Sequence, residues 1–176
     1  APFIVFDDCD IESAVEGLML GKFRNTGQVC VSPNRIYVQE KIYDEFVRRT
    51  VDAVKKLKIG NGLQGETNIG PLIDFAAVDK VEEHIKDAVS KGAKIETGGK
   101  RDKLGGQFFE ATVLANVNKS MKLANEETFG PVAPFFKFKT EEEVIELANN
   151  TEFGLAAYFF SKDIARIWRV AEAIET

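Results

Sequence analysis

Apolar and polar residues follow two alternating patterns along the chain. Short apolar runs such as residues 2–6 and 132–138 are typical of buried strands, whereas residues 74–91 space their apolar positions as one face of a helix requires. The pattern predicts strands over 2–6, 35–39, 93–96, 111–114, 132–138 and 155–160, and helices over 10–22, 41–57, 74–91, 141–149 and 162–174. Because such alternation builds parallel sheets, we expect an α/β fold: a largely parallel twisted sheet with helices on both faces.

Composition agrees with a single globular domain. The 176 residues are 44% hydrophobic and 29% charged, which is enough to bury a core. A net charge of −5 argues against a nucleic-acid partner, since binding phosphates needs a basic face. No apolar run approaches the ~20 residues of a membrane span. The two cysteines give no disulfide framework, and no cysteine or histidine cluster is available for a metal site. We therefore expect a cytoplasmic protein with no metal, membrane or nucleic-acid partner.

One glycine-rich segment matches a nucleotide-binding pattern without its context. Residues 60–65 fit G-x-G-x-x-G, which in a dinucleotide-binding unit follows a strand and opens a helix. Here the segment follows an expected helix and leads into a loop-like stretch at 66–71. We interpret it as a helix C-cap followed by a flexible surface loop, and the glycine pairs at 98–99 and 105–106 as a hairpin or loop between strands.

Cys30 is the candidate nucleophile. A reactive cysteine needs its thiolate form, which backbone N–H groups or positive charge favour. Gly27 permits a tight backbone approach just before Cys30, and Pro33 suits the first turn of a following helix, so helix-terminal N–H groups are expected nearby. Such groups would also stabilise an oxyanion. The alternative is that Cys30 is a small hydrophobe buried in the core.

Two other residues with reactive side chains favour structural interpretations. Cys9 lies between Asp8 and Asp10, whose carboxylates would raise the pKa of its thiol, so we interpret it as structural. His84 falls on the polar side of an expected helix. A dyad of His84 with Cys30 has no supporting spacing.

Four segments carry a family resemblance. Residues 23–35, FRNTGQVCVSPNR, resemble the active-site segment of the aldehyde dehydrogenase superfamily, and residues 126–132, EETFGPV, resemble its second signature. Residues 69–74 and 151–159 are similar to the succinate-semialdehyde dehydrogenase branch in particular. The resemblance extends over the whole chain.

The resemblance implies a role for four residues. Cys30 corresponds to the nucleophile, Glu127 to the glutamate that binds the nicotinamide ribose hydroxyls, and Phe129 to the aromatic residue beside the nicotinamide, with NAD or NADP as cofactor. Arg24 corresponds to an arginine that contacts the remote carboxylate of the substrate. A guanidinium group is the natural partner of a carboxylate, although without the resemblance a structural salt bridge is an equal interpretation of Arg24.

The resemblance also implies an activity and a domain organisation. An aldehyde, with succinate semialdehyde favoured, would be oxidised to its acid through a thiohemiacetal and a thioester on Cys30. By the same resemblance, residues 1–176 would be a catalytic domain truncated at both ends. The nucleotide-binding domain, the general-base glutamate, the oxyanion-binding asparagine and the oligomerisation arm would be absent. The chain alone would then be inactive, and the full-length enzyme a homo-oligomer.

The chain departs from the family pattern at one position, and two alternatives to the proposed enzyme and substrate stay open. Ser32 stands where relatives often carry a second cysteine, which excludes a thiol switch by that route. A different aldehyde is an alternative substrate. A non-catalytic interaction module on the same fold is the alternative function.

Overall fold

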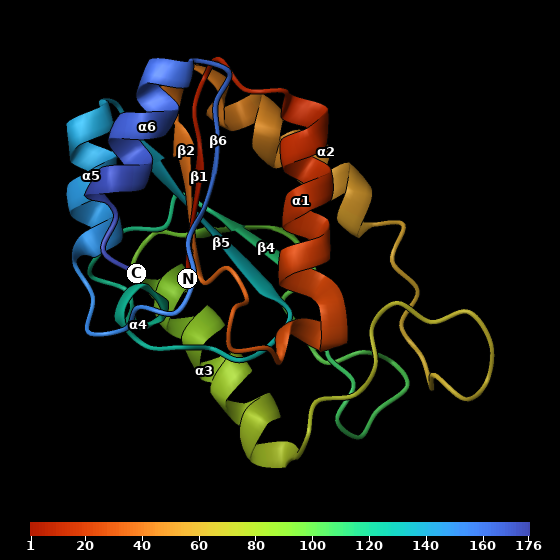
Figure 1. Ribbon diagram of the computed structural model, residues 1–176. Coiled ribbons are helices and arrows are strands. Elements are labelled where there is room, and N and C mark those ends of the chain that lie inside the picture. The colour runs from red at the N-terminus through yellow and green to blue at the C-terminus, as the bar shows by residue number, and fades with distance from the viewer.

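A six-stranded sheet forms the centre of the molecule in the computed structural model, which describes residues 1–176 (Figure 1). The strands are β1 (Pro2–Val5), β2 (Arg35–Gln39), β3 (Lys94–Thr97), β4 (Thr112–Ala115), β5 (Val132–Phe138) and β6 (Tyr158–Phe160). They are arranged in the order β3-β4-β5-β2-β1-β6. All neighbours are parallel except the edge strand β3, which runs antiparallel to β4. The predicted largely parallel sheet is confirmed.

Helices cover both faces of this sheet, as predicted (Figure 1). They are α1 (Ile11–Phe23), α2 (Tyr43–Val54), α3 (Phe75–Ser90), α4 (Lys122–Asn125), α5 (Glu141–Asn149) and α6 (Ile164–Ala173), with short 3-10 turns η1 (Arg24–Gly27) and η2 (Glu40–Ile42). Successive residues of a strand point to opposite faces. Accordingly, Phe3 belongs to an apolar cluster with Leu18 of α1, whereas Ile4 belongs to a second cluster with Val144 of α5.

Side-chain caps explain why most helix starts could be read from the sequence. Asp10, Asp74, Thr140 and Asp163 each accept a hydrogen bond from a backbone N–H group in the first turn of the helix that follows. A residue of this type directly before an apolar-periodic stretch is the usual start signal. The bounds of α5 and β5 are those predicted.

Two local predictions around turns were wrong. No helix follows Cys30, because the chain turns at residues 30–34, where the N–H of Ser32 donates to the carbonyl of Val29, and then enters β2 at Arg35. Pro33 therefore lies in a loop. Gly60 is not a helix C-cap either, since α2 ends at Val54 with Lys55 as its cap. The loop character of residues 60–65 is confirmed.

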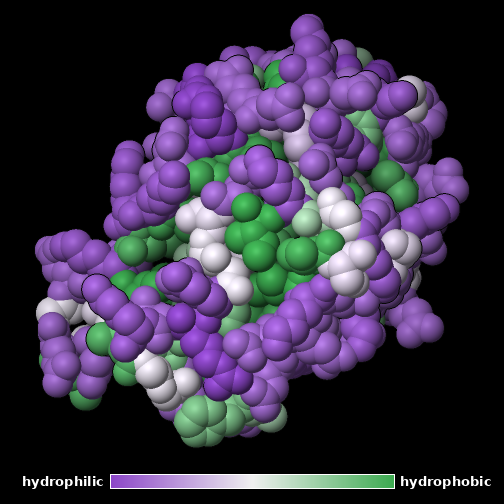
Figure 2. Space-filling view, turned by 180° about the vertical axis from the view of Figure 1, so that it is seen from behind, coloured by the Kyte–Doolittle hydropathy of each residue, from purple (hydrophilic) through white to green (hydrophobic).

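The outer surface is mostly hydrophilic. Figure 2 shows the side opposite to Figure 1, where one apolar area lies near the middle among polar residues. None of the helices combines the length and the hydropathy that crossing a bilayer requires.

Candidate active site

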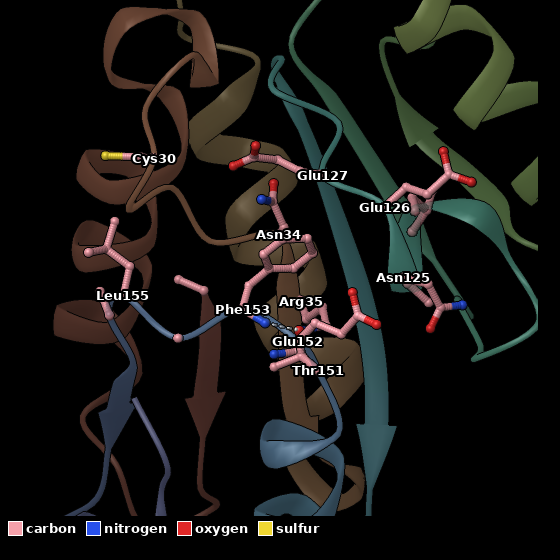
Figure 3. Close-up of a pocket in the computed structure, with 15 residues that line it drawn as sticks. Cys30, Asn34, Arg35, Asn125, Glu126, Glu127, Thr151, Glu152, Phe153 and Leu155 are labelled. Carbon is pink, nitrogen blue, oxygen red and sulfur yellow. Dashed lines mark hydrogen bonds between the residues drawn. The ribbon is translucent and has the colours of Figure 1, made fainter.

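A cavity of about 430 Å³ brings together residues from four separate segments (Figure 3). Its lining includes two of the four predicted site residues, Cys30 and Glu127, which are far apart in the sequence. The remaining lining residues are Ala1, Asn34, Arg35, Leu123, Ala124, Asn125, Glu126, Thr151, Glu152, Phe153, Gly154, Leu155 and Ala156.

The cavity lies where the chain enters the parallel strands. Ala1 precedes β1, Asn34 precedes β2, Glu127 precedes β5 and Ala156 precedes β6. Ligands in open α/β sheets generally bind at the carboxyl ends of the strands. This cavity lies at the amino ends of the strands instead, so it is formed by the loops that lead into them.

Cys30 is exposed, whereas Cys9 is buried. Burial, with Asp8 and Asp10 adding to it, raises the pKa of the Cys9 thiol to about 11, which confirms the structural interpretation of that residue. The alternative of Cys30 as a buried hydrophobe is wrong. In Figure 3 its sulfur points away from Glu127 at the edge of the cavity, so an incoming reactant can approach it from outside.

An unusual backbone precedes Cys30. Asn25, Thr26 and Gly27 adopt left-handed φ angles of 51°, 59° and 74° in succession. A Cβ on Gly27 would lie 2.2 Å from the carbonyl oxygen of Gly130, so only glycine allows the segment 23–35 to approach the segment 126–132 this closely. The turn before the nucleophile is therefore packed directly against the end of the segment that carries Glu127.

The segment at 69–73 supports the same turn by hydrogen bonds. Thr26 Oγ1 donates to the carbonyl oxygen of Gly70 at 3.1 Å and accepts from the N–H of Gly70 at 3.0 Å. The N–H of Ile73 donates to Oε1 of Gln28 at 2.8 Å, and the amide of Gln28 donates to the carbonyl of Pro71 at 3.3 Å. These bonds stabilise a conformation that non-glycine residues adopt only at a cost of about 1–3 kcal/mol each.

Lys22 is a buried cation beside the cavity that the sequence did not identify. Its side chain is fully buried, and Nζ donates to Oδ1 of the cavity residue Asn34 at 3.2 Å. Burial lowers the pKa of Lys22 to about 7, while the charge of Glu127 opposes that shift. A lysine inside an amphipathic helix reads as a surface residue, so only the fold reveals this charge.

Arg35 fixes one wall of the cavity. Its guanidinium donates to the carbonyl oxygens of Leu147 at 2.9 Å and Ala148 at 3.0 Å, at the C-terminal end of α5. These carbonyls carry the negative end of the helix dipole, which favours a cation. Since residues 151–156 follow directly, Arg35 holds the start of the loop that lines the cavity opposite Glu127.

The structure does not bring Arg24 and Phe129 into this cavity. Arg24 is exposed at the end of α1 and its side chain forms no hydrogen bond or ion pair, so the alternative of a structural salt bridge is not supported. Phe129 is 38% exposed with a left-handed φ of 52°. It borders a separate hollow with Gln28 and Ile73.

His84 differs from the sequence interpretation. It was expected on the polar side of its helix, yet its side chain is 1% exposed. Nδ1 lies 3.0 Å from Oγ1 of Thr128, and Nε2 lies 3.3 Å from Oε2 of Glu126. Its charged sequence neighbours Glu82 and Glu83 concealed the fact that His84 itself faces inward.

Comparison with known proteins decides the family. A profile described as the aldehyde dehydrogenase family matches residues 1–176. The chain belongs to this family. The glutarate-semialdehyde dehydrogenase of Pseudomonas aeruginosa is 59% identical to it, and the succinate-semialdehyde dehydrogenase (NADP(+)) of Escherichia coli is 57% identical. The crystal structure of succinate-semialdehyde dehydrogenase from Burkholderia pseudomallei matches with a TM-score of 0.99 at 58% identity.

The chain corresponds to part of each of these aldehyde dehydrogenases. All three comparisons cover 99% of this chain but only 36% of the relative. The resemblance read from the two segments around Cys30 and Glu127 is thereby confirmed at the level of the family. The relatives divide between two semialdehydes as named substrates.

Proposed function

We propose that this chain is the thiol-bearing part of an NAD(P)-dependent aldehyde dehydrogenase that oxidises a semialdehyde, with succinate semialdehyde as the first candidate. The observation that supports this most is the exposed Cys30 at the edge of the cavity that Glu127 also lines. One side chain supplies the nucleophile, and the other supplies a carboxylate for a hydroxylated ligand.

The chemistry on Cys30 proceeds in two halves. The thiolate adds to the aldehyde carbon, a carbon–sulfur bond forms, and the carbonyl π electrons become an oxyanion. Loss of a hydride from that carbon leaves a thioester on Cys30. Water then adds to the thioester carbon, the carbon–sulfur bond breaks, and the acid and the free thiolate are released. The net change is aldehyde, oxidised cofactor and water to acid, reduced cofactor and a proton.

Two residues offer contacts for a nicotinamide cofactor, Glu127 from the cavity and Phe129 from the separate hollow that it borders. When bound, such a cofactor accepts the hydride. Glu127 would accept hydrogen bonds from the ribose hydroxyls, because an ionised carboxylate is purely an acceptor and a hydroxyl can donate. Phe129, with its exposed ring, would pack beside the nicotinamide. Both NAD and NADP are compatible with these contacts.

Arg24 would set the substrate class. Its guanidinium is exposed and has no intramolecular partner, so it is available to a carboxylate at the far end of a semialdehyde. Glutarate semialdehyde is the second candidate, favoured by the name of the Pseudomonas aeruginosa relative. One additional methylene changes binding by only about 1–3 kcal/mol, so both semialdehydes can be substrates of one site.

An Arg24→Ala variant of the whole polypeptide, as its gene encodes it, tests this proposal. We expect kcat/KM for succinate and glutarate semialdehyde to fall about a hundredfold, as the loss of a charge-assisted hydrogen bond pair predicts. The value for butanal, which has no carboxylate, should stay within about threefold of wild type. Equal losses for all three aldehydes would remove the substrate assignment.

Two further statements accompany the proposal. We expect residues 1–176 alone to show no cofactor reduction with any aldehyde, because this chain spans only 36% of the length of the aldehyde dehydrogenases that it matches; turnover at enzyme-like rates would contradict this. A homo-oligomeric full-length enzyme in the cytoplasm remains a prediction.

A further inference from the structure

The side chain of His84 contacts the residues on both sides of Glu127. One ring nitrogen lies 3.3 Å from the carboxylate of Glu126 and the other lies 3.0 Å from the hydroxyl of Thr128. Thr128 is 5% exposed and His84 is 1% exposed, so both partners of the second contact are removed from water. Glu127 itself makes no hydrogen bond within the chain and remains exposed.

The backbone explains why a contact to these two neighbours orients the residue between them. Glu126 has extended dihedral angles of φ −111° and ψ 137°. Side chains alternate in direction along an extended chain. If the side chains of Glu126 and Thr128 point to α3, that of Glu127 points to the opposite side. Figure 3 shows this arrangement, with the carboxylate of Glu126 turned toward the helix and that of Glu127 turned toward Asn34.

We propose that His84 is a positioning residue that holds the Glu127 carboxylate toward the Cys30 cavity and so preorganises the cofactor-binding contact. The inference rests on the proposed function, because it needs Glu127 to bind the ribose. His84 touches neither the cavity nor the reacting atoms, so its effect is transmitted by the backbone of residues 126–128.

The hydrogen-bond chemistry of the imidazole fits this task. An ionised Glu126 can only accept, so Nε2 carries the proton and donates to it, which leaves Nδ1 to accept from the Thr128 hydroxyl. The neutral ring therefore satisfies both contacts at once. Burial lowers the pKa of His84, while the hydrogen bond and charge of Glu126 oppose that shift.

Helix α3 also contacts the segment 122–130 on either side of the two hydrogen bonds made by His84. Oδ2 of Asp87 accepts from the N–H of Lys122 at 2.8 Å, at the start of α4. At the other end, a Cβ on Gly130 would lie 2.6 Å from Cγ2 of Val81. Contacts from α3 thus extend from Lys122 to Gly130, and His84 is the polar contact nearest to Glu127.

Steady-state kinetics on the whole polypeptide test the proposal with His84→Leu, His84→Gln and Ile85→Ala. Leucine removes both hydrogen bonds at similar volume, so we expect KM for the cofactor to rise about tenfold. Glutamine carries one donor and one acceptor and should restore KM to within about threefold of wild type. Ile85→Ala, which makes a cavity in the same buried face of α3, controls for destabilisation and should leave KM for the cofactor unchanged.

Two readouts separate positioning from general damage. The alkylation rate of Cys30 and KM for the aldehyde should stay at wild-type values in His84→Leu. An unchanged KM for the cofactor in His84→Leu, or an equal rise in Ile85→Ala, would overturn the proposal. If His84→Leu does not fold, Thr128→Val decides in the same way, since it removes one of the two bonds and should raise KM for the cofactor a few-fold.

A Glu127→Gln variant distinguishes this inference from the function on which it rests. If Glu127→Gln leaves KM for the cofactor unchanged, the ribose contact is wrong and the role of His84 fails with it. If Glu127→Gln raises KM and His84→Leu does not, the proposed function stands and only the inference about His84 is overturned.

Discussion

Cys30 and Cys9 have the same thiol chemistry in very different surroundings. Cys30 is exposed, while Cys9 is buried and its thiol pKa is raised to about 11 by burial and by the carboxylates of Asp8 and Asp10. Only the thiolate reacts with alkylating agents. We expect iodoacetamide at pH 7.5 to label Cys30 at least about tenfold faster than Cys9, as measured by peptide mass spectrometry. Cys9→Ser should keep the fast phase and Cys30→Ser should lose it; equal slow labelling of both would contradict the nucleophile assignment.

Gly27 makes possible the close contact between the segment that carries Cys30 and the segment that carries Glu127. An alanine there would need a left-handed φ of 74° and a Cβ 2.2 Å from the Gly130 carbonyl oxygen. We expect Gly27→Ala to lower the free energy of unfolding by about 3 kcal/mol and to abolish turnover, because the backbone around Cys30 must move.

Gly105→Ala is the matched control for this substitution. Gly105 has nearly the same φ, 72°, but no heavy atom lies within 4 Å of the Cβ that an alanine would add. Gly105→Ala should lower the free energy of unfolding by only about 1 kcal/mol, because alanine is strained in a left-handed backbone. Urea unfolding curves measure both variants, and equal losses would show that the contact with Gly130 contributes nothing.

Individual site residues differed in how well the sequence revealed them. Cys30 and Glu127 stand inside contiguous motifs, so a local reading found them. Lys22 and His84 have partners that are distant in sequence, namely Asn34, Glu126 and Thr128. Charged neighbours on the same helix made His84 look solvated, and nothing in the local pattern predicts a buried lysine.

At the scale of elements, Asp8 joins the end of β1 to the start of α6. Its carboxylate accepts from Oγ of Ser161 at 2.8 Å, from the N–H groups of Lys162 and Asp163 at 2.9 Å each, and from the guanidinium of Arg166 at 2.8 Å. Partial burial raises the pKa of Asp8, but these donors lower it by more, so the net pKa lies below the usual 3.8.

The sign of this shift sets a pH dependence. A carboxyl group with a depressed folded pKa contributes stability that is complete above 3.8 and is lost as pH falls below it. Asp8→Asn should therefore lower the free energy of unfolding by about 2 kcal/mol at pH 7, and the difference from wild type should shrink between about pH 4 and pH 2. Urea titrations across this range measure it, and a constant difference would contradict the role of the charge.

Element boundaries could be predicted where the cause is local. The bounds of α5 follow from its Thr140 cap, and those of β5 from an uninterrupted apolar run. The start of β6 was placed too early, at residue 155, because residues 155–157 continue the apolar run of the strand, whereas Leu155 and Ala156 line the cavity and the strand begins at Tyr158. Pro33 was assigned to a helix because proline suits a first turn, whereas the tertiary structure requires the chain to enter β2 two residues later.

At the scale of the whole molecule, the class of the fold could be predicted but the strand order could not. Alternating strand and helix patterns imply a parallel sheet, yet nothing in them specifies that β2 lies between β1 and β5. That order places the loops before β2 and β5 side by side, and those loops carry Cys30 and Glu127. Proximity of the two signatures is therefore a property of the topology.

The free energy of unfolding should depend on pH because the charge of Lys22 is buried. Burial lowers the pKa of its ammonium to about 7 from an ordinary value of 10.5. Between these values the unfolded state binds more protons than the folded state, so the free energy of unfolding rises with pH. Lys22→Met removes this dependence and should be about 2 kcal/mol more stable than wild type at pH 6, where the folded protein buries an ammonium that has a single hydrogen bond.

The advantage of Lys22→Met should shrink steadily as pH rises from 7 toward 10.5. At pH 9.5 the lysine of the folded wild type is neutral, but the unfolded lysine is still mostly protonated, so part of the cost remains until the pH passes the ordinary pKa of 10.5. Urea unfolding at pH 6, 7.5 and 9.5 measures the difference, with Lys55→Met as the control because Lys55 is exposed. Parallel curves for wild type and Lys22→Met across this range would mean that the ammonium of Lys22 is as well stabilised in the folded protein as in water.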